Sequence, residues 1–345
     1  MLEKVIFTDD IRTALHQALD HQKFSGIAVL VDNHTSRDCY PIIEGVTDHP
    51  LIIRVTPGEK HKNITTCEWI WDALTQAKFD RKSLLINLGG GVISDMGGFC
   101  ASTYKRGIKF INLPTTLLAQ VDASVGGKLG IDFHGFKNQI GLFVMPELVI
   151  IDTGFLKTLP LRELKSGFAE AIKHCLIYDR EEWYKLNQNS LDQQPWKNLV
   201  NRSVKIKSSI VEQDPLEKGL RKILNFGHTI GHALESFFLE TAGNIVLHGE
   251  AIAAGMICEI FLSEELTGLD KKESFQALEF IFNTYGKLSF DKKDIPRIAE
   301  LTQQDKKNES GELRFSLINR IGQASYNIPV TAEQVANVLD RYCHI

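Results

Sequence analysis

Three histidines in the C-terminal half of the chain have the side-chain type and spacing of a metal site. His228 and His232 stand at positions i and i+4 of a segment with helical apolar periodicity, and His248 follows sixteen residues later. Residues four apart share one helix face, so the two imidazoles can converge on one small volume and His248 can supply a third nitrogen. A lone His is more often a hydrogen-bonded core residue, but three of the chain's 11 His so close together favour a metal centre.

The residues around these histidines disfavour a zinc protease, and they do not identify which carboxylate would complete the metal site. The zinc-protease pattern has Glu directly after the first His, where this chain has Thr229. Two His and one carboxylate would leave a coordination position for substrate or water. Glu170, between alanines on an expected helix, and Glu250, beside His248, are both candidates. Spacing does not choose between them, and an ordinary ion pair of Glu170 with Lys173 fits equally well.

A glycine-rich turn in the N-terminal half has the composition of an anion-binding loop. Gly89-Gly90-Gly91 follows an apolar run at 84–88 and leads into an expected helix. Such a turn lets the backbone approach a pyrophosphate, and the helix start offers unpaired N–H groups. The spacing is neither the dinucleotide fingerprint nor the Walker pattern, so a purely structural turn is an equal alternative. Thr115-Thr116 and the charged turn at 57–62 each follow another expected strand, which favours a ligand at this edge of a sheet.

The secondary structure expected to position these residues changes near 155–160, from alternating strands and helices to mainly helices. Apolar runs that alternate with helical patterns predict the strands of a mostly parallel sheet at 26–31, 51–55, 84–88, 110–113 and 148–151. Beyond Pro160, helical periodicity predicts helices at 161–178, 194–213, 219–239, 249–266 and 272–285. A hairpin is expected over 313–326, and a capping box at 331–334 predicts a final helix.

Composition bounds the class of protein. With 345 residues, 43% of them hydrophobic, the chain is long enough for two cores. A net charge of −4 excludes a general attraction to nucleic acid or anionic membranes. The chain has no apolar run long enough to span a membrane and no leader pattern, and its six cysteines lack a C-x-x-C pair. We therefore expect free thiols and a cytoplasmic location, and local cations such as Arg106, Lys205 and Lys207 suit a phosphorylated substrate.

Four motifs, in order and with near-constant spacing, resemble those of the 3-dehydroquinate synthases of the sugar-phosphate cyclase superfamily. They are GGGVI-x-D at 89–95, LPTTLLAQVD-x-SVGGK at 113–128, FAE-x-IK at 168–173, and LNFGHTIGHA at 224–233 with its distal LHGE at 247–250. The match runs from Asp32 to Lys307. The resemblance implies a Rossmann-like α/β NAD-binding domain over 1–157 and a mainly α-helical domain over 158–345 that binds a metal ion and the substrate. It also implies bound NAD, one Zn²⁺ or Co²⁺ ion and a homodimer.

The resemblance also implies roles for individual residues. The metal ligands would be Glu170, His228 and His248, while His232 would contact the substrate's phosphate. The other residues around the substrate would be Arg106 (reaching across the dimer), Asp122, Lys128, Asn138, Lys173, Lys207, Glu217, Arg221, Asn225 and Lys306 or Lys307. The NAD contacts would be Asp32, Glu59, Lys62, Gly91, Val92, Ile93, Ser94, Asp95, Thr115, Thr116, Lys128, Lys137, Phe155, Leu156, Lys157 and Thr158. Two departures from the family pattern, Ser94 and the loop 132–136, bear on the shape of the NAD loops.

The implied reaction converts 3-deoxy-D-arabino-heptulosonate 7-phosphate to 3-dehydroquinate and phosphate, a lyase step toward aromatic amino acids. It proceeds by transient oxidation with NAD, phosphate elimination, reduction, ring opening and an intramolecular aldol closure. A metal-dependent polyol dehydrogenase is one alternative, but it has no use for so many phosphate-facing cations and commonly has Asp as its carboxylate ligand. Other cyclases, which make a valiolone or an inosose, fit less well because Asn225 and His232 resemble the dehydroquinate branch. A silent NAD-binding scaffold is disfavoured by the intact Glu170, His228, His248 and Lys173.

Overall fold

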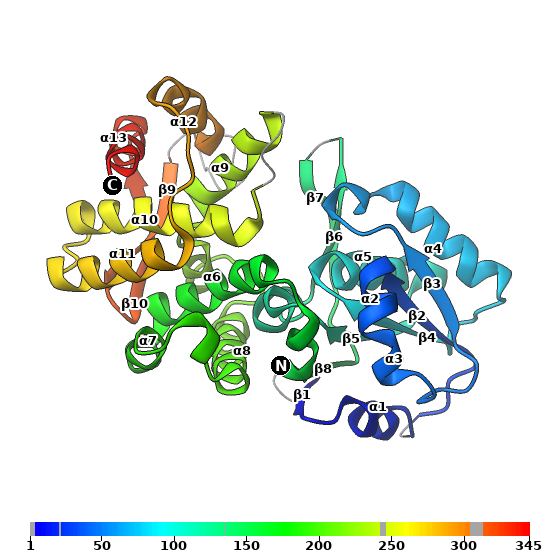
Figure 1. Ribbon diagram of the computed structural model, residues 1–345. Coiled ribbons are helices and arrows are strands. Elements are labelled where there is room, and N and C mark those ends of the chain that lie inside the picture. The colour runs from blue at the N-terminus through cyan, green and yellow to red at the C-terminus, as the bar shows by residue number, and fades with distance from the viewer. Residues whose placement is uncertain (1–3, 21, 135, 242–245, 304–312) are drawn as a thin grey trace. The chain divides into compact units, whose positions relative to one another are not determined.

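The structure is a computed structural model that describes residues 4–20, 22–134, 136–241, 246–303 and 313–345 (Figure 1). It divides into two compact units, an N-terminal unit of residues 1–160 and a C-terminal unit of residues 161–345. None of the described helices combines the length and apolar character that crossing a membrane requires. All six cysteines are free, as expected.

The N-terminal unit is built on a parallel six-stranded sheet of order β1-β8-β5-β4-β2-β3 (Figure 1). Its strands are β1 (Val5–Thr8), β2 (Ile27–Asp32), β3 (Leu51–Val55), β4 (Leu84–Gly89), β5 (Lys109–Pro114) and β8 (Leu148–Asp152). The α-helices are α1 (Ile11–Asp20), α2 (Asn33–Asp38), α3 (Tyr40–Ile43), α4 (Ile64–Gln76) and α5 (Gly91–Thr103). All five predicted strands are confirmed, while β1, a run of only 4 residues, was not predicted.

Alternating side chains of the strands supply two cores, one on each face of this sheet. Ala28 and Leu30 of β2 pack with α4 and α5, and Val29 and Val31 pack with α1 and α3. The strands are apolar on both faces because helices cover both, which is the usual pattern of a parallel sheet. Parallel strands also bring their carboxyl ends to one edge, so the loops that follow β2, β3, β4, β5 and β8 share that edge.

A separate antiparallel hairpin, β6 (Lys128–Phe133) with β7 (Phe136–Phe143), was not among the elements predicted from the sequence. Before it, residues Ala119–Ala123 form one π-helical turn, η4, that contains Asp122. Every described side chain of β7 is exposed. The hairpin was missed because Gly126, Gly127 and Gly130 interrupt the alternation of apolar residues that normally marks a strand.

The C-terminal unit is mainly helical. Its α-helices are α6 (Leu161–Tyr178), α7 (Arg180–Asn187), α8 (Trp196–Gln213), α9 (His228–Glu240), α10 (His248–Leu266), α11 (Lys271–Tyr285), α12 (Ile295–Gln303) and α13 (Ala332–Cys343), beside the hairpin β9 (Leu313–Arg320) with β10 (Gln323–Val330). Short 3₁₀ turns are η2 (Glu59–His61), η3 (Tyr104–Arg106), η5 (Thr153–Thr158), η6 (Leu191–Gln193), η7 (Leu220–Asn225) and η8 (Lys292–Asp294), the first three in the N-terminal unit. The helix α10 is central, since it contacts α6, α9, α11, α13 and β9.

The helices at 161–178, 194–213, 249–266 and 272–285, the hairpin and the final capped helix are confirmed within a few residues. Thr331 and Gln334 form the predicted capping box of α13. The continuous helix predicted over 219–239 is wrong, because η7 ends at Asn225 and α9 begins only at His228. Between them Gly227 has φ +78°, a left-handed conformation that breaks the helix and that glycine adopts without strain.

Candidate active site

Three candidate metal ligands from three helices meet in the C-terminal unit. Glu170 projects from α6, His228 is the first residue of α9 and His248 is the first residue of α10. Nε2 of His228 and Nε2 of His248 lie 3.4 and 3.5 Å from Oε1 of Glu170. One ligand atom from each residue lies within 4.8 Å of the other two. Two imidazole nitrogens and a carboxylate so close together form a donor set that suits a zinc ion.

The Glu170 carboxylate is the most unusual group of the three. It is fully buried and forms an ion pair with the ammonium of Lys173, one turn later on the same helix. Neither of its oxygens accepts a hydrogen bond of normal geometry from the described residues. One explanation for a buried polar atom without a hydrogen bond is a bound water or ion. The residues therefore fit a divalent cation at this position.

The second ring nitrogen of each histidine has a partner that can orient the ring. His228 Nδ1 lies 3.1 Å from the carbonyl oxygen of Phe226. Because a carbonyl only accepts, Nδ1 carries the proton and the lone pair of Nε2 faces Glu170. His248 Nδ1 lies 3.6 Å from Oε2 of Glu235, an ion-pair distance that gives His248 a similar orientation.

The surroundings of the two imidazoles shift their pKa values in opposite directions. Burial and the Lys173 ammonium lower the pKa of His228 to about 4, so this ring is neutral and ready to ligate at pH 7. Burial also lowers the pKa of His248, but the carboxylates of Glu170 and Glu235 outweigh burial and raise that pKa to about 9. Burial raises the pKa of Glu170, whereas Lys173 and the imidazoles more than compensate and hold it well below its ordinary value.

A second group of possible ligands shares His248 and contains His232 and Glu235. The His232 ring lies one turn after His228, with ring centroids 5.2 Å apart, and 5.9 Å from that of His248. The three histidines thus gather as their spacing predicts. Glu170 distinguishes the first group, since its carboxylate is buried and turned toward both ligand histidines.

Glu250, the other carboxylate that the sequence left open, has a structural partner instead. It accepts two hydrogen bonds from Arg162 at 2.7 and 2.8 Å, and one from the N–H of Leu247 at 2.8 Å. The last of these caps the start of α10. Glu250 therefore holds the helix that begins with His248, and belongs to neither group of candidate ligands.

Among the residues expected around the substrate, several lie in the C-terminal unit. Lys207 of α8 and Arg221 of η7 are buried, which is rare for cations and typical of residues with a defined partner. Asn225 donates from Nδ2 to Oε1 of Glu217 at 2.8 Å, so the structure brings two of these expected residues together. Lys306 and Lys307 lie outside the described residues.

The glycine turn of the N-terminal unit joins β4 to α5. Gly90 precedes the helix, which begins at Gly91 without a side-chain cap, so its first N–H groups are left for a ligand. A Cβ on Gly90 would lie 3.0 Å from Cγ2 of Thr116, and the N–H of Thr115 donates to the carbonyl of Gly89 at 3.0 Å. The glycine turn and the Thr pair thus lie side by side at the carboxyl ends of β4 and β5.

Lys62 links Asp95, in the first turns of α5, to Asn138, a residue expected at the substrate. Its ammonium donates to Oδ2 of Asp95 and to Oδ1 of Asn138, both at 2.7 Å. Asn138 has φ +49° and its N–H donates to Oδ1 of Asp132 at 2.8 Å. Burial lowers the pKa of Lys62, but Asp95 and Glu59 outweigh burial and raise it, so the buried ammonium stays charged.

The remaining residues expected at NAD are spread along the same unit. Asp32 caps α2 at the end of β2, and residues 155–158 belong to η5 (Thr153–Thr158), which directly follows β8. Both segments lie at the carboxyl ends of sheet strands, where ligands of such sheets gather. Lys128 and Lys137 belong to the hairpin β6–β7, and Arg106, with φ +69°, ends η3 after α5.

Two acidic residues near the candidate metal ligands were missed by sequence reasoning. Glu235 of α9 approaches His248, and the buried Glu259 of α10 accepts a hydrogen bond from the residue before His228. A signal for Glu259 does exist, because it is a single charge within the apolar stretch 251–262. No comparable signal marks Glu235.

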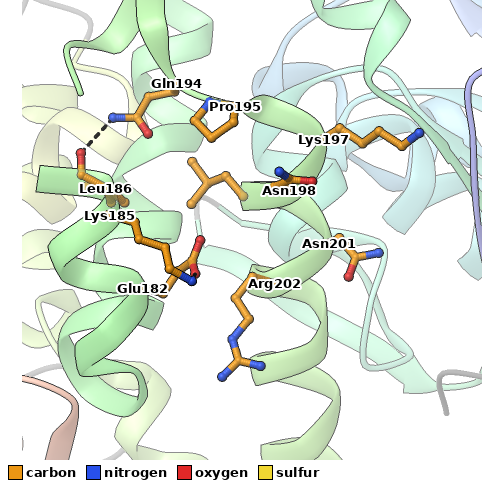
Figure 2. A pocket seen from close by; sticks show the side chains of 10 residues that line it. Glu182, Lys185, Leu186, Gln194, Pro195, Lys197, Asn198, Asn201 and Arg202 are labelled. Carbon is orange, nitrogen blue, oxygen red and sulfur yellow. Dashed lines mark hydrogen bonds and ion pairs between the residues drawn. The ribbon is translucent and has the colours of Figure 1, made fainter. Parts of the chain in front are cut away.

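A separate surface pocket of about 350 Å³ lies between α7 and α8 (Figure 2). Its walls include the charged side chains of Glu182, Lys185 and Arg202, and Gln194 donates to the carbonyl of Leu186 at 2.9 Å. None of its described lining residues is a candidate metal ligand.

Family models match most of the chain. The N-terminal model of 3-dehydroquinate synthase covers residues 52–166 and the C-terminal model covers residues 167–308. The 3-dehydroquinate synthase of Parabacteroides distasonis is 42% identical over 99% of this chain and 98% of its own length. That of Campylobacter concisus is 43% identical over 86% of this chain and 85% of its own length.

Solved structures show the same fold. A 2-epi-5-epi-valiolone synthase from Streptomyces hygroscopicus, solved with NAD⁺ and Zn²⁺ bound, has a TM-score of 0.87 at 24% identity, covering 99% of this chain and 96% of its own. A 2-deoxy-scyllo-inosose synthase, solved with carbaglucose-6-phosphate, NAD⁺ and Co²⁺, has a TM-score of 0.84 at 25% identity, covering 98% of this chain and 96% of its own. A probable glycerol dehydrogenase from Sinorhizobium meliloti is more distant, with a TM-score of 0.67 at 16% identity and cover of 99% and 96%.

Proposed function

Because the chain belongs to the 3-dehydroquinate synthase family, we propose that it converts 3-deoxy-D-arabino-heptulosonate 7-phosphate to 3-dehydroquinate and inorganic phosphate. The chain is then a carbon–oxygen lyase that acts on a phosphate ester. Residues 1–157 form the NAD-binding domain, and residues 158–345 bind the metal ion and the substrate. The observation that carries this proposal is the buried Glu170 carboxylate turned toward two histidines.

Glu170, His228 and His248 hold a Zn²⁺ or Co²⁺ ion in this proposal. Two imidazole nitrogens and one carboxylate leave coordination positions for the substrate. The carbonyl of Phe226 and the carboxylate of Glu235 orient the two rings from behind. Support comes from the inosose synthase, whose structure contains Co²⁺.

NAD binds at the carboxyl edge of the parallel sheet. The uncapped start of α5 offers backbone N–H groups and a positive dipole end to the pyrophosphate. Thr115 and Thr116 lie beside this turn, and the buried Lys62 forms an ion pair with Asp95 of α5. Asp32, Lys137 and residues 155–158 complete the proposed contacts.

When bound, NAD supplies a hydride acceptor that is regenerated within the cycle, and the metal ion supplies a Lewis acid for a substrate hydroxyl. The chain's own residues bind and orient the substrate. His232, Lys207 and Arg221 present cationic or hydrogen-bonding groups to its phosphate. Glu217 fixes the amide of Asn225, and Lys62 fixes the amide of Asn138, so both amides are held for hydroxyl groups of the substrate.

We also propose a homodimer in the cytoplasm, with Arg106 of one subunit reaching the substrate of the other. The six free cysteines support the cytoplasmic location, because free thiols are typical of a reducing compartment.

A phosphate-release assay tests the function. The chain, incubated with the heptulosonate phosphate, catalytic NAD and Zn²⁺, should release phosphate stoichiometrically with the substrate consumed and accumulate no NADH. A polyol dehydrogenase would instead accumulate NADH from a simple polyol without releasing phosphate, and that result would exclude the lyase.

A further inference from the structure

The central helix α10 carries a buried charge that the proposed reaction does not use. Residues 251–263 of this helix are all buried, and Glu259 is 0% exposed among them. A carboxylate in such surroundings is retained only when hydrogen bonds or opposite charges compensate it. Its partners therefore identify its role.

The Glu259 carboxylate holds the start of the neighbouring helix α9. Oε2 accepts the N–H of Gly227 at 2.6 Å, and Oε1 lies 3.4 Å from the N–H of Ile230. Gly227 precedes α9 and has no side chain with which to cap it. Glu259 supplies that cap from another helix, and its charge faces the positive end of the α9 dipole.

The two helices touch directly at this point. A Cβ on Gly255 would lie 2.0 Å from the carbonyl oxygen of Gly227 and 2.7 Å from the N–H nitrogen of Gly231. The backbone of α9 thus lies against the backbone of α10, one turn before Glu259. With so little space between them, the hydrogen bond to Gly227 determines where α9 begins along α10.

That starting point determines the position of a candidate metal ligand. His228 directly follows Gly227, and the His228 ring is oriented by the carbonyl of Phe226, which directly precedes Gly227. His248 and Glu259 are eleven residues apart on α10, which is close to three full turns and places them on the same face. One face of α10 therefore carries the candidate ligand His248 at its start. Three turns later the same face carries Glu259, which contacts the residue before the candidate ligand His228.

We propose that Glu259 is a positioning residue of the metal centre: through the N–H of Gly227 it sets the position of His228 relative to His248. This inference rests on the proposed metal centre of Glu170, His228 and His248. Loss of the Glu259 charge lets the first turn of α9 move. The three donor atoms then match a metal ion less well, although none of them has been changed.

Metal affinity and the visible spectrum of bound Co²⁺ test this role in the full-length chain. The apo forms of wild type and of Glu259→Gln are titrated with Co²⁺ against a competing chelator, and their d–d absorption bands are recorded. Outer partners of metal ligands change affinity by about 10- to 100-fold. We expect the dissociation constant of Glu259→Gln to rise by at least about tenfold, with shifted d–d bands.

Glu264→Gln is the matched control, because it replaces another glutamate of α10 with glutamine. Its carboxylate accepts hydrogen bonds from Ser274 and Arg341 and faces α11 and α13. We expect this variant to keep the affinity and the spectrum of wild type.

Several outcomes would overturn the inference. A folded Glu259→Gln chain with wild-type affinity and spectrum would reduce Glu259 to a residue that only stabilises the fold. If this variant does not fold, Glu259→Asp, which keeps the charge but shortens the side chain, is titrated instead. Failure of both to fold would also assign Glu259 to folding alone. A wild-type chain that binds no Co²⁺ would overturn the metal centre itself, and the inference with it.

Discussion

Glu170 and Lys173, one turn apart on α6, form an ion pair whose side chains are only 1% and 2% exposed. Removing one partner of a buried pair leaves an uncompensated charge and costs about 3–5 kcal/mol. We therefore expect Lys173→Met to lower the free energy of unfolding of the metal-free chain by about 3 kcal/mol. Saturating Zn²⁺ should restore part of this loss, because the ion binds the folded state and compensates Glu170. Urea denaturation with and without Zn²⁺ measures both effects.

A surface pair of the same spacing provides the control for Lys173→Met. Lys185 and Glu182 are also three residues apart, on α7, but the Lys185 side chain is 70% exposed. Exposed pairs contribute about 0–1 kcal/mol, so Lys185→Met should change stability by less than about 1 kcal/mol with or without Zn²⁺. Equal losses in the two variants would contradict a special role for burial at Glu170.

Removal of one candidate ligand should abolish metal retention. In His248→Ala the proposed site loses one of its three donors, and we expect purified protein to contain almost no Zn²⁺ and to release no phosphate from the substrate. Metal analysis and the phosphate assay check the two results separately. His16→Ala, which removes an exposed histidine paired with Asp20 on α1, should leave both unchanged. Normal metal content in His248→Ala would show that the ligands are misassigned.

The parallel sheet could be predicted from sequence because its strands are buried on both faces. Continuous apolar runs such as 148–151 stand out from the polar loops on either side. The hairpin β6–β7 gave no such signal, since all of the described side chains of β7 are exposed and no core imposes an alternation on them. The helix predicted over 219–239 continued through Gly227, because the helical spacing of apolar residues is not interrupted there. The spacing carries no information on the backbone angle of Gly227, whose φ of +78° breaks the helix.

The choice between Glu170 and Glu250 shows what spacing leaves undetermined. Both lie near candidate ligands in sequence, and both fit a helix. The fold separates them through contacts distant in the chain: Arg162, 88 residues earlier, binds Glu250, whereas His228 and His248 approach Glu170. Such contacts depend on how α6, α9 and α10 pack, and the spacing of residues along the sequence does not determine that packing.

Lys62 should matter for NAD binding although its side chain is buried. It donates two short hydrogen bonds, to Asp95 and Asn138, and a hydrogen bond to a charged group contributes about 1.5–3 kcal/mol. We expect Lys62→Met to raise the dissociation constant of NAD by at least about tenfold, because Asp95 loses its buried partner beside the loop. Isothermal titration calorimetry measures the change. Lys60→Met, at an exposed position of η2 two residues before Lys62, should bind NAD like wild type.

The cap of α10 should make stability depend on pH in the acid range. Burial raises the pKa of Glu250, but hydrogen bonds from Arg162 and the Leu247 N–H outweigh burial and hold it below its ordinary value. The stabilisation by Glu250 is therefore complete above the unfolded pKa of about 4.3 and is lost as the pH falls through the lower folded pKa.

Glu250→Gln tests that dependence in the metal-free chain. At pH 7 it should be less stable than wild type by about 1 kcal/mol, the usual contribution of a helix cap. The difference should close as the pH is lowered through about 4, because wild type loses the same charge by protonation. Urea denaturation midpoints over a series of pH values give both curves. A difference that stays constant down to about pH 3 would mean that the charge of Glu250 contributes nothing to the start of the helix that carries His248.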